Sequence, residues 1–357
     1  MRVRAIALAL LLAGGIHAQT VDPFEQTYGP YTPGVRDRTI ALSATPQGIL
    51  LAWTEVVEPG TQQSEIHTGM LDFDAKLTGP IRRIAPSRPG VPMTNPAIGT
   101  DFNGFFISWA ELSPVNYDPK SIAGVITDPF GHPVSPVRRY GPWLTGQPQV
   151  IFNGIEYRLY GEQTYLIAPD GSVIDRRGGG MNRIPFATPE ANGWVDWRGT
   201  IQFGTGRRPL LELGTTVLTY DDDHRDSFDV RNAFGPPAVF AEGRDVLIVW
   251  GSDTGLGAVR ILDGVRGRAF AYEDPAARGA EPAVAGNLVV YQNDDGDIYG
   301  SVLTANAFGT PFPISTGSDW DTTPRVLAVG YGRYLVAYVR EHGNGQVSLA
   351  GRFVTIH

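Results

Sequence analysis

The sequence predicts an all-β protein: a single β-propeller of about seven four-stranded blades, closed by an N-terminal strand that completes the last blade. Three observations predict this fold. A unit of four short apolar segments recurs along the chain, as propeller blades do. The second segment of each clear unit is apolar at consecutive positions. The last unit ends one segment short of the others.

The repeat is clearest at residues 281–316, EPAVAGNLVVYQNDDGDIYGSVLTANAFGTPFPIST. It predicts a short strand after Pro282, a second strand ending at Tyr291, an Asp- and Gly-rich turn, and strands around 298–303 and 312–315. An aromatic residue closes each second strand, at a mean spacing of about 47 to 48 residues: Trp53, Trp109, Tyr160, Trp197, Trp250, Tyr291 and Tyr338. Four strands at this period are typical of propeller blades. The units around Tyr160 and Trp197 are degenerate, which leaves six or eight blades as alternatives.

The second strands are continuously apolar, as in LIVW at 247–250, LVVY at 288–291 and LVAY at 335–338. A strand that is apolar on both faces is buried on both faces, which favours sheets packed face to face over an open sheet with one solvated side. No segment combines a 3.6-residue apolar period with capping residues, so we expect very little helix.

The two ends of the chain predict how the ring closes. The last unit stops at His357 after three strands, whereas FEQTYGPYTPG, from Phe24, is similar to VRRYGPWLTGQ, from Val137, which connects two units. Residues near 24–28, from Phe24 to Tyr28, are therefore expected to pair with the C-terminal blade. Such pairing leaves no open sheet edge between the first and last blades.

The repeat resembles a group of mostly uncharacterised bacterial secreted β-propeller proteins built from copies of the form PAVA…YLVVW…DIYG…FxIST. In this chain PAVA begins at Pro282, LVVY at Leu288 and DIYG at Asp297. The resemblance is clear over the C-terminal 120 residues. It implies the propeller fold and an exported location, and it carries no catalytic residues onto this chain.

The N-terminal residues 1–18 read as a secretory signal peptide: Arg2 and Arg4, an apolar run, then small residues up to Ala18. Residues 19–357 would form the propeller domain of a secreted protein, periplasmic or extracellular. The apolar run is shorter than the roughly 20 residues that a spanning helix needs, so we expect no membrane insertion. A net charge of −8 without a basic run makes nucleic acid an unfavourable partner. We expect a monomer.

The motif search favours binding over catalysis. The chain has no cysteine, no G-x-S-x-G elbow and no phosphate-binding glycine loop, and its histidines lack metal-ligand spacing. We therefore expect a non-catalytic module that recognises a protein or a glycan through loops on one face, and no cofactor except, as an alternative, calcium.

Glutamate stands two residues after the closing aromatic in three successive units, at Glu55, Glu111 and Glu162; Asp253 and Asn293 occupy nearby positions in later units. All five are expected where the second strand enters its hairpin, on the face that also carries the connections between blades. They predict an acidic ligand-binding rim. The alternatives are solvated hairpins or a catalytic carboxylate pair, which would make the protein a glycoside hydrolase or polysaccharide lyase.

Asp-rich turns offer the calcium alternative, most clearly Asp294, Asp295 and Asp297 in NDDGD. Carboxylate oxygens in a turn are the ligands that calcium prefers. The spacing does not fit the 12-residue calcium loop, and Asp, Asn and Gly also favour hairpin turns for conformational reasons.

Overall fold

The computed structural model describes residues 18–23, 25–31, 39–57, 63–86, 91–113, 119–142, 148–161, 163–178, 183–187, 192–196, 199–202, 210–213, 215–220, 224–229, 233–262, 265–277 and 281–357. Within them the chain forms β-strands and one short 3-10 turn, η1 (Pro275–Ala277). The expectation of an all-β fold is confirmed. None of the described residues belongs to a helix long and apolar enough to cross a membrane.

Apart from one separate hairpin, the described strands pair antiparallel into seven sheets; each is formed by one sequence unit, and the N-terminal strands join the last. The first four sheets are β3 (Ile40–Thr45), β4 (Gly48–Val56), β5 (Ser64–Leu71) and β6 (Arg82–Ala85); β7 (Met93–Thr100), β8 (Phe105–Leu112), β9 (Pro119–Thr127) and β10 (Arg138–Gly141); β11 (Gln149–Phe152), β12 (Tyr157–Tyr160), β13 (Gln163–Ile167) and β14 (Val173–Gly178); and β15 (Arg183–Ala187), β16 (Asn192–Asp196), β19 (Thr215–Tyr220) and β20 (His224–Asp229).

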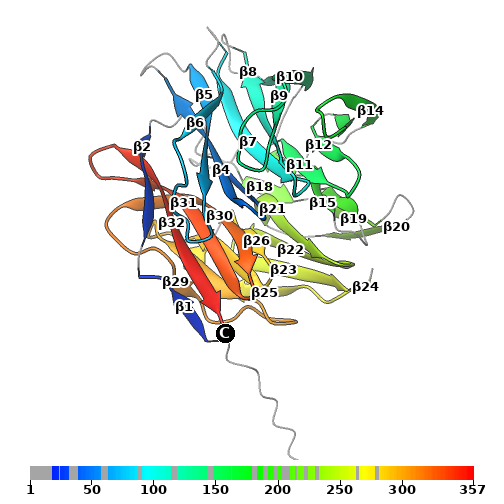
Figure 1. Ribbon diagram of the computed structural model, residues 1–357. Helices are drawn as coiled ribbons and strands as arrows, with labels where there is room; N and C mark the ends of the chain where they lie inside the picture. The colour runs from blue at the N-terminus through cyan, green and yellow to red at the C-terminus, as the bar shows by residue number, and fades with distance from the viewer. Residues whose placement is uncertain are drawn as a thin grey trace, which may run out of the picture.

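The remaining sheets are β21 (Ala233–Glu242), β22 (Asp245–Ser252), β23 (Gly255–Leu262), β24 (Val265–Arg266) and β25 (Phe270–Glu273); β26 (Ala283–Ala285), β27 (Leu288–Gln292), β28 (Ile298–Val302) and β29 (Phe312–Pro313); and β30 (Trp320–Gly330), β31 (Arg333–Glu341) and β32 (Val347–Ile356), joined by β1 (Gln19–Val21) and β2 (Gln26–Tyr31). The first strand of each sheet contacts the first strand of the next, and β30 contacts β3, so the sheets form a closed ring (Figure 1). This is the predicted seven-bladed β-propeller.

The middle strands are apolar on both faces because each face packs on a different neighbouring sheet. In β8, Phe105, Ile107 and Trp109 pack in a cluster with the first sheet. The alternate residues Phe106 and Ala110 pack in a cluster with the third sheet. Side chains on a strand alternate between its two faces, so eight buried residues in a row require a sheet on each side. The interpretation of the continuous apolar runs is confirmed.

The N-terminal strands complete the seventh sheet, as predicted. Both β1 and β2 pair antiparallel with β32, from Gln19 opposite Ile356 to Tyr31 opposite Val347. Figure 1 shows β1 and β2 beside β32, which lies at the opposite end of the chain. The completing strand is longer than predicted and divided in two, with β1 ending before the predicted segment begins; Phe24 lies outside the described residues.

The fourth unit is degenerate because it contains an insertion. A separate hairpin, β17 (Gly199–Gln202) and β18 (Leu210–Leu213), lies between β16 and β19, which pair with each other as the second and third strands of their sheet. The inserted β18 contacts β21 of the fifth sheet. Trp197, which marks this unit in the sequence, lies outside the described residues.

The direction of the strands defines two faces of the ring. The upper face carries the hairpins between second and third strands and the connections between sheets. The lower face carries the hairpins between first and second strands and between third and fourth strands. The predicted rim positions therefore belong to the upper half of the ring.

Candidate functional site

The seven innermost strands surround a cavity of about 500 Å³ on the axis of the ring. Every sheet contributes to its wall: Ile40 and Leu42 from the first, Ile98 from the second, Val150 from the third, Ile184 from the fourth, Val239 from the fifth, Val284 from the sixth and Val326 from the seventh. A volume of this size is typical of small-ligand sites, which are mostly apolar with few polar groups. We refer to it as the central cavity.

The polar groups of the central cavity include two side chains of opposite charge. Glu281 precedes β26, and its side chain is exposed; Arg325 lies in β30 and is partly exposed. One guanidinium nitrogen of Arg325 donates a hydrogen bond of 3.0 Å to the carbonyl of Pro324. Gln149 and Tyr160 add an amide and a phenol from the third sheet.

Two of the innermost strands have a residue with positive φ within their first four positions. Asn95 and Thr323 have φ angles of +53° and +49°, and each is followed by a proline. Positive φ is unfavourable for residues other than glycine, most of all for a β-branched one. In both strands the pairing register shifts at this point, between Thr94 and Ala97 and between Thr322 and Arg325. Strain of this kind clusters at functional sites.

Glu111, a predicted rim residue, is buried in an ion pair within its own sheet. Its side chain is 2% exposed, and Arg139 of β10 donates to it through two nitrogens, each at 2.8 Å. Ser121 of β9 donates a third hydrogen bond of 2.8 Å. The ion pair raises the pKa of the Arg139 guanidinium above its ordinary value, against the opposing effect of burial. Glu111 therefore holds β8, β9 and β10 together.

Glu55 lies at the end of a chain of ionisable side chains on the first sheet. Its carboxylate is 31% exposed and lies 3.5 Å from Nδ1 of His67, whose Nε2 lies 3.1 Å from the carboxylate of Glu65. Glu65 is 8% exposed and pairs with Arg83 of β6 at 3.1 Å. Glu55 keeps some exposed surface, but most of this chain of groups ties β5 to β6.

The other rim candidates lie in separate hairpins or outside the described residues. Asp253 lies in the hairpin between β22 and β23, and Asn293 in the hairpin between β27 and β28. Glu162 lies outside the described residues. None of these residues lines the central cavity as far as the structure describes it.

The calcium candidates shape a hairpin. The backbone N–H of Asp297 donates to the Asp295 carboxylate at 3.1 Å, and the N–H of Asp294 donates to the Asn293 side chain at 2.8 Å. Burial and the negative charges of Asp295 and Asp321 raise the pKa of Asp297. In the described parts of the chain, three or more His, Asp or Glu side chains do not converge in a way that could hold a metal ion.

Sequence reasoning missed the residues that line the central cavity. The sequence does contain a pattern that could have identified them. A proline lies in or next to most innermost strands, in NPA at 95–97, PPA at 236–238, EPA at 281–283 and TPR at 323–325. The residues around this proline, including Glu281 and Arg325, face the axis. The prediction placed the site on the second-to-third hairpins, which are farther from the axis.

No family model matches the chain, and no curated protein matches it. Solved structures do resemble it. A protein of unknown function from Dyadobacter fermentans is 14% identical with a TM-score of 0.54, over 94% of this chain and 100% of that one. The β-propeller domain of the Trilobed protease from Pyrococcus furiosus is 12% identical with a TM-score of 0.52, over 87% and 94%.

Virginiamycin B lyase from Staphylococcus aureus is 12% identical with a TM-score of 0.51, over 93% of this chain and 99% of that one. A protease domain and a lyase thus have similar folds. One fold can carry many functions, because function depends on the residues of the site. At these identities the likeness shows the fold alone, and it agrees with the ring of sheets: the chain is a β-propeller.

Proposed function

We propose that this protein is an exported, non-catalytic binding module that takes a peptide segment of a protein ligand into its central cavity. The observation that carries the proposal is the composition of this cavity: apolar walls from all seven sheets, with Arg325 and Glu281 among them. A peptide segment offers apolar side chains for the walls and polar or charged groups for these two residues. A rigid ring holds such groups in fixed geometry, which favours affinity.

A protein ligand fits this composition better than a glycan does. Sugar rings bind by stacking on aromatic side chains, and Tyr160 is the one aromatic residue among the described residues that line the cavity. The enzymatic alternative needs two carboxylates facing a substrate. The pair that motivates it, Glu55 and Glu111, lacks this property because both oxygens of Glu111 bind Arg139.

The test selects peptides from a random phage-display library on the immobilised protein and measures their dissociation constants by fluorescence anisotropy. Val239→Trp fills the cavity, and we expect it to raise the dissociation constant at least 10-fold. Arg325→Gln should weaken binding of peptides that carry an acidic group. Val265→Trp, at a residue that is 70% exposed in the outer strand β24, is the control and should leave binding unchanged.

Selected peptides that bind Val239→Trp as well as wild type would contradict the proposal. The proposal would also be contradicted if a glycan on an array lost its binding in Val239→Trp while no peptide did. Turnover of a polysaccharide by wild type that is lost in folded Glu111→Gln would restore the enzymatic alternative.

Export is the second part of the proposal. It is supported by the leader-like residues 1–18 and by the position of β1, which begins at Gln19, so that cleavage after Ala18 would leave the strand intact. Expression in a bacterial host followed by N-terminal sequencing tests it. We expect a mature chain beginning at Gln19; a full-length chain retained in the cytoplasm would contradict export.

A further inference from the structure

The sixth sheet has an unusually short hairpin between its first two strands. From the proline of the first strand to the aromatic that closes the second, this sheet has ten residues, Pro282 to Tyr291, whereas the fifth has fourteen, Pro237 to Trp250. Accordingly, β26 has 3 residues and its neighbours β21 and β30 have 10 and 11. The sixth sheet therefore stops short of the lower face.

The missing hairpin length leaves a pocket of about 320 Å³ between the fifth and seventh sheets. The turn of the short hairpin, Gly286–Asn287, forms one wall, and Tyr334 of β31 lies beside it. The Tyr334 hydroxyl donates a hydrogen bond of 2.8 Å to the Asn287 side chain. Gly286 has φ +55°, and a Cβ added there would lie 2.7 Å from the Tyr334 hydroxyl oxygen, so glycine allows this close approach. We call this site the lower pocket.

The face of the fifth sheet that the short hairpin leaves uncovered is part apolar and part charged. Phe240, Leu247 and Arg260 are cross-strand neighbours and form a row across β21, β22 and β23. Glu242 and Asp245, paired at the end of the same hairpin, lie next to this row. All five line the lower pocket.

Arg260 has hydrogen-bonding capacity that the described part of the protein leaves unused. Its Nε is buried and has no hydrogen-bond partner there. Burial lowers the pKa of Arg260, and the nearby charge of Asp245 opposes that effect only in part. A guanidinium in this state gains most from a planar anion that accepts two hydrogen bonds, such as a carboxylate.

The charges of the lower pocket select the remaining chemistry of the ligand. One guanidinium and two carboxylates, those of Glu242 and Asp245, give the lining a formal charge of −1. A simple carboxylic acid would bring a second negative charge to it. A zwitterion avoids this repulsion, because its carboxylate can bind Arg260 while its ammonium group lies near Glu242, which is exposed at the mouth. Phe240 and Leu247 supply an apolar surface between these ends.

We propose that the lower pocket is a second binding site, specific for a zwitterion with an apolar side chain: a free apolar amino acid or a dipeptide. Its volume lies near the low end of small-ligand sites, roughly 300–1,000 Å³, which excludes longer peptides from full burial. The site shares no residue with the central cavity, so it does not depend on the function proposed above.

Isothermal titration calorimetry with leucyl-leucine tests the proposal. We expect saturable binding, weakened about 10-fold or more in N-acetyl-leucyl-leucine, which lacks the ammonium group, and in leucyl-leucinamide, which lacks the carboxylate. Glycylglycine keeps both charges without the apolar side chains and should also bind weakly. Arg260→Gln should weaken leucyl-leucine binding by a similar factor. Arg266→Gln, in β24 of the same sheet and outside the pocket lining, is the matched control.

Glu242→Gln provides an independent variant at an exposed turn, should Arg260→Gln fail to fold as judged by circular dichroism. It should weaken leucyl-leucine binding and leave the weaker binding of N-acetyl-leucyl-leucine, which has no ammonium group, unchanged. No saturable binding of leucyl-leucine would overturn the proposal. Equal binding of leucyl-leucine and its acetylated form would also overturn it, because the site would then recognise an anion and not a zwitterion.

Discussion

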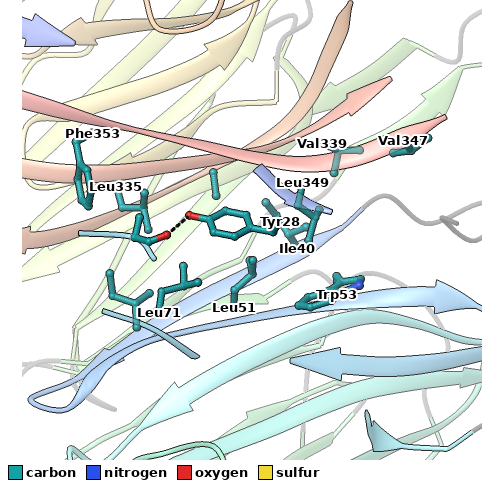
Figure 2. Packing of buried hydrophobic residues seen from close by; sticks show 13 residues of the cluster. Tyr28, Ile40, Leu51, Trp53, Leu71, Leu335, Val339, Val347, Leu349 and Phe353 are labelled. Atoms are coloured by element: carbon teal, nitrogen blue, oxygen red, sulfur yellow. Dashed lines mark hydrogen bonds between the residues drawn. The ribbon is translucent and has the colours of Figure 1, made fainter. Parts of the chain in front are cut away.

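The hydroxyl of Tyr28 donates a hydrogen bond of 3.0 Å to the carbonyl of Ala75, and this bond joins the N-terminal strand to the first sheet. Both residues are buried, and Ala75 has φ +59° in the turn that follows β5. Figure 2 shows the Tyr28 ring between Leu335 and Leu349 of the seventh sheet and Leu51 and Leu71 of the first. Burial raises the pKa of Tyr28, so the phenol stays protonated and able to donate. Tyr28 thus links the two sheets at which the ring closes.

Tyr28→Phe should lower the free energy of unfolding by about 1 kcal/mol, because it removes the hydrogen bond and keeps the ring. Tyr28→Ala should cost about 3–5 kcal/mol, since it also leaves a cavity between the sheets. Urea denaturation followed by circular dichroism measures both. Equal stability of wild type and Tyr28→Ala would show that the N-terminal strand is not packed in the ring.

Glu25 forms the polar part of the same closure. Its carboxylate accepts hydrogen bonds from Tyr338 and Arg340 of β31, and from Arg352 of β32 at 3.2 Å. Arg340 also pairs through two nitrogens with Asp321, which is 1% exposed. Glu25→Gln should therefore destabilise the protein by about 2 kcal/mol, because two arginines lose a charged partner. Thermal melts of wild type and Glu25→Gln test this. Identical melts for Glu25→Gln would contradict it.

Glu111→Gln should reduce stability and leave ligand binding unchanged. The substitution breaks the charge pair with Arg139, and because Arg139 is 43% exposed it can be resolvated, so we expect a loss of about 1–3 kcal/mol. Denaturant unfolding and the peptide assay, run on the same preparation, separate the two effects. Lost binding at full stability would return Glu111 to the ligand site.

Asp297 should make stability depend on pH in a direction unusual for a carboxylate. Burial and the charges of Asp295 and Asp321 raise the pKa of Asp297 above the ordinary 3.8 in the folded state. Its contribution to the free energy of unfolding is therefore fully present below pH 3.8, and it is lost as the pH rises through the raised pKa. Asp297→Asn should raise the melting temperature at pH 7 by roughly 1–2 °C, because partial exposure screens these charges. The gain should vanish near pH 3. If calcium chloride raises the melting temperature of wild type and not that of Asp297→Asn, this turn binds calcium instead.

The blades could be predicted from the sequence because each is a local pattern. The run LIVW at 247–250, for example, is apolar on both faces wherever it lies in the ring. The N-terminal strand could be assigned because closure needs a partner for β32 and the similarity to the segment from Val137 provides one. Its division into β1 and β2 depends on contacts that a repeat pattern does not encode.

The sites could not be predicted in the same way, because they depend on register. Glu111 and Arg139 are 28 positions apart, and only the pairing of β8 with β9 and β9 with β10 brings them together. One signal was present: the fourth strands of the first two sheets both carry a pair of arginines, Arg82 with Arg83 and Arg138 with Arg139, and the second of each pair binds a buried glutamate. Glu65 and Glu111 thus each join two strands of one blade, and of the two only Glu111 belongs to the recurring glutamates. Similarly, counting residues in the sequence predicts the short hairpin at Gly286. It does not predict which residues of the neighbouring sheets line the space beside that hairpin.

The closure of the ring can be measured directly, because the chain has no cysteine of its own. Thr20 of β1 is the cross-strand partner of Thr355 in β32, and such partners lie about 4.5–5.5 Å apart, close enough for a disulfide. Thr27 pairs with Ala350, five residues from Thr355, which is about 17 Å along the strand. We predict that the Thr20→Cys and Thr355→Cys pair oxidises to an intramolecular disulfide and melts several degrees higher than its reduced form, whereas Thr27→Cys with Thr355→Cys does not cross-link. Failure of the first pair to form a disulfide in the folded protein, or equal cross-linking of both pairs, would contradict a ring closed by its N-terminal strand.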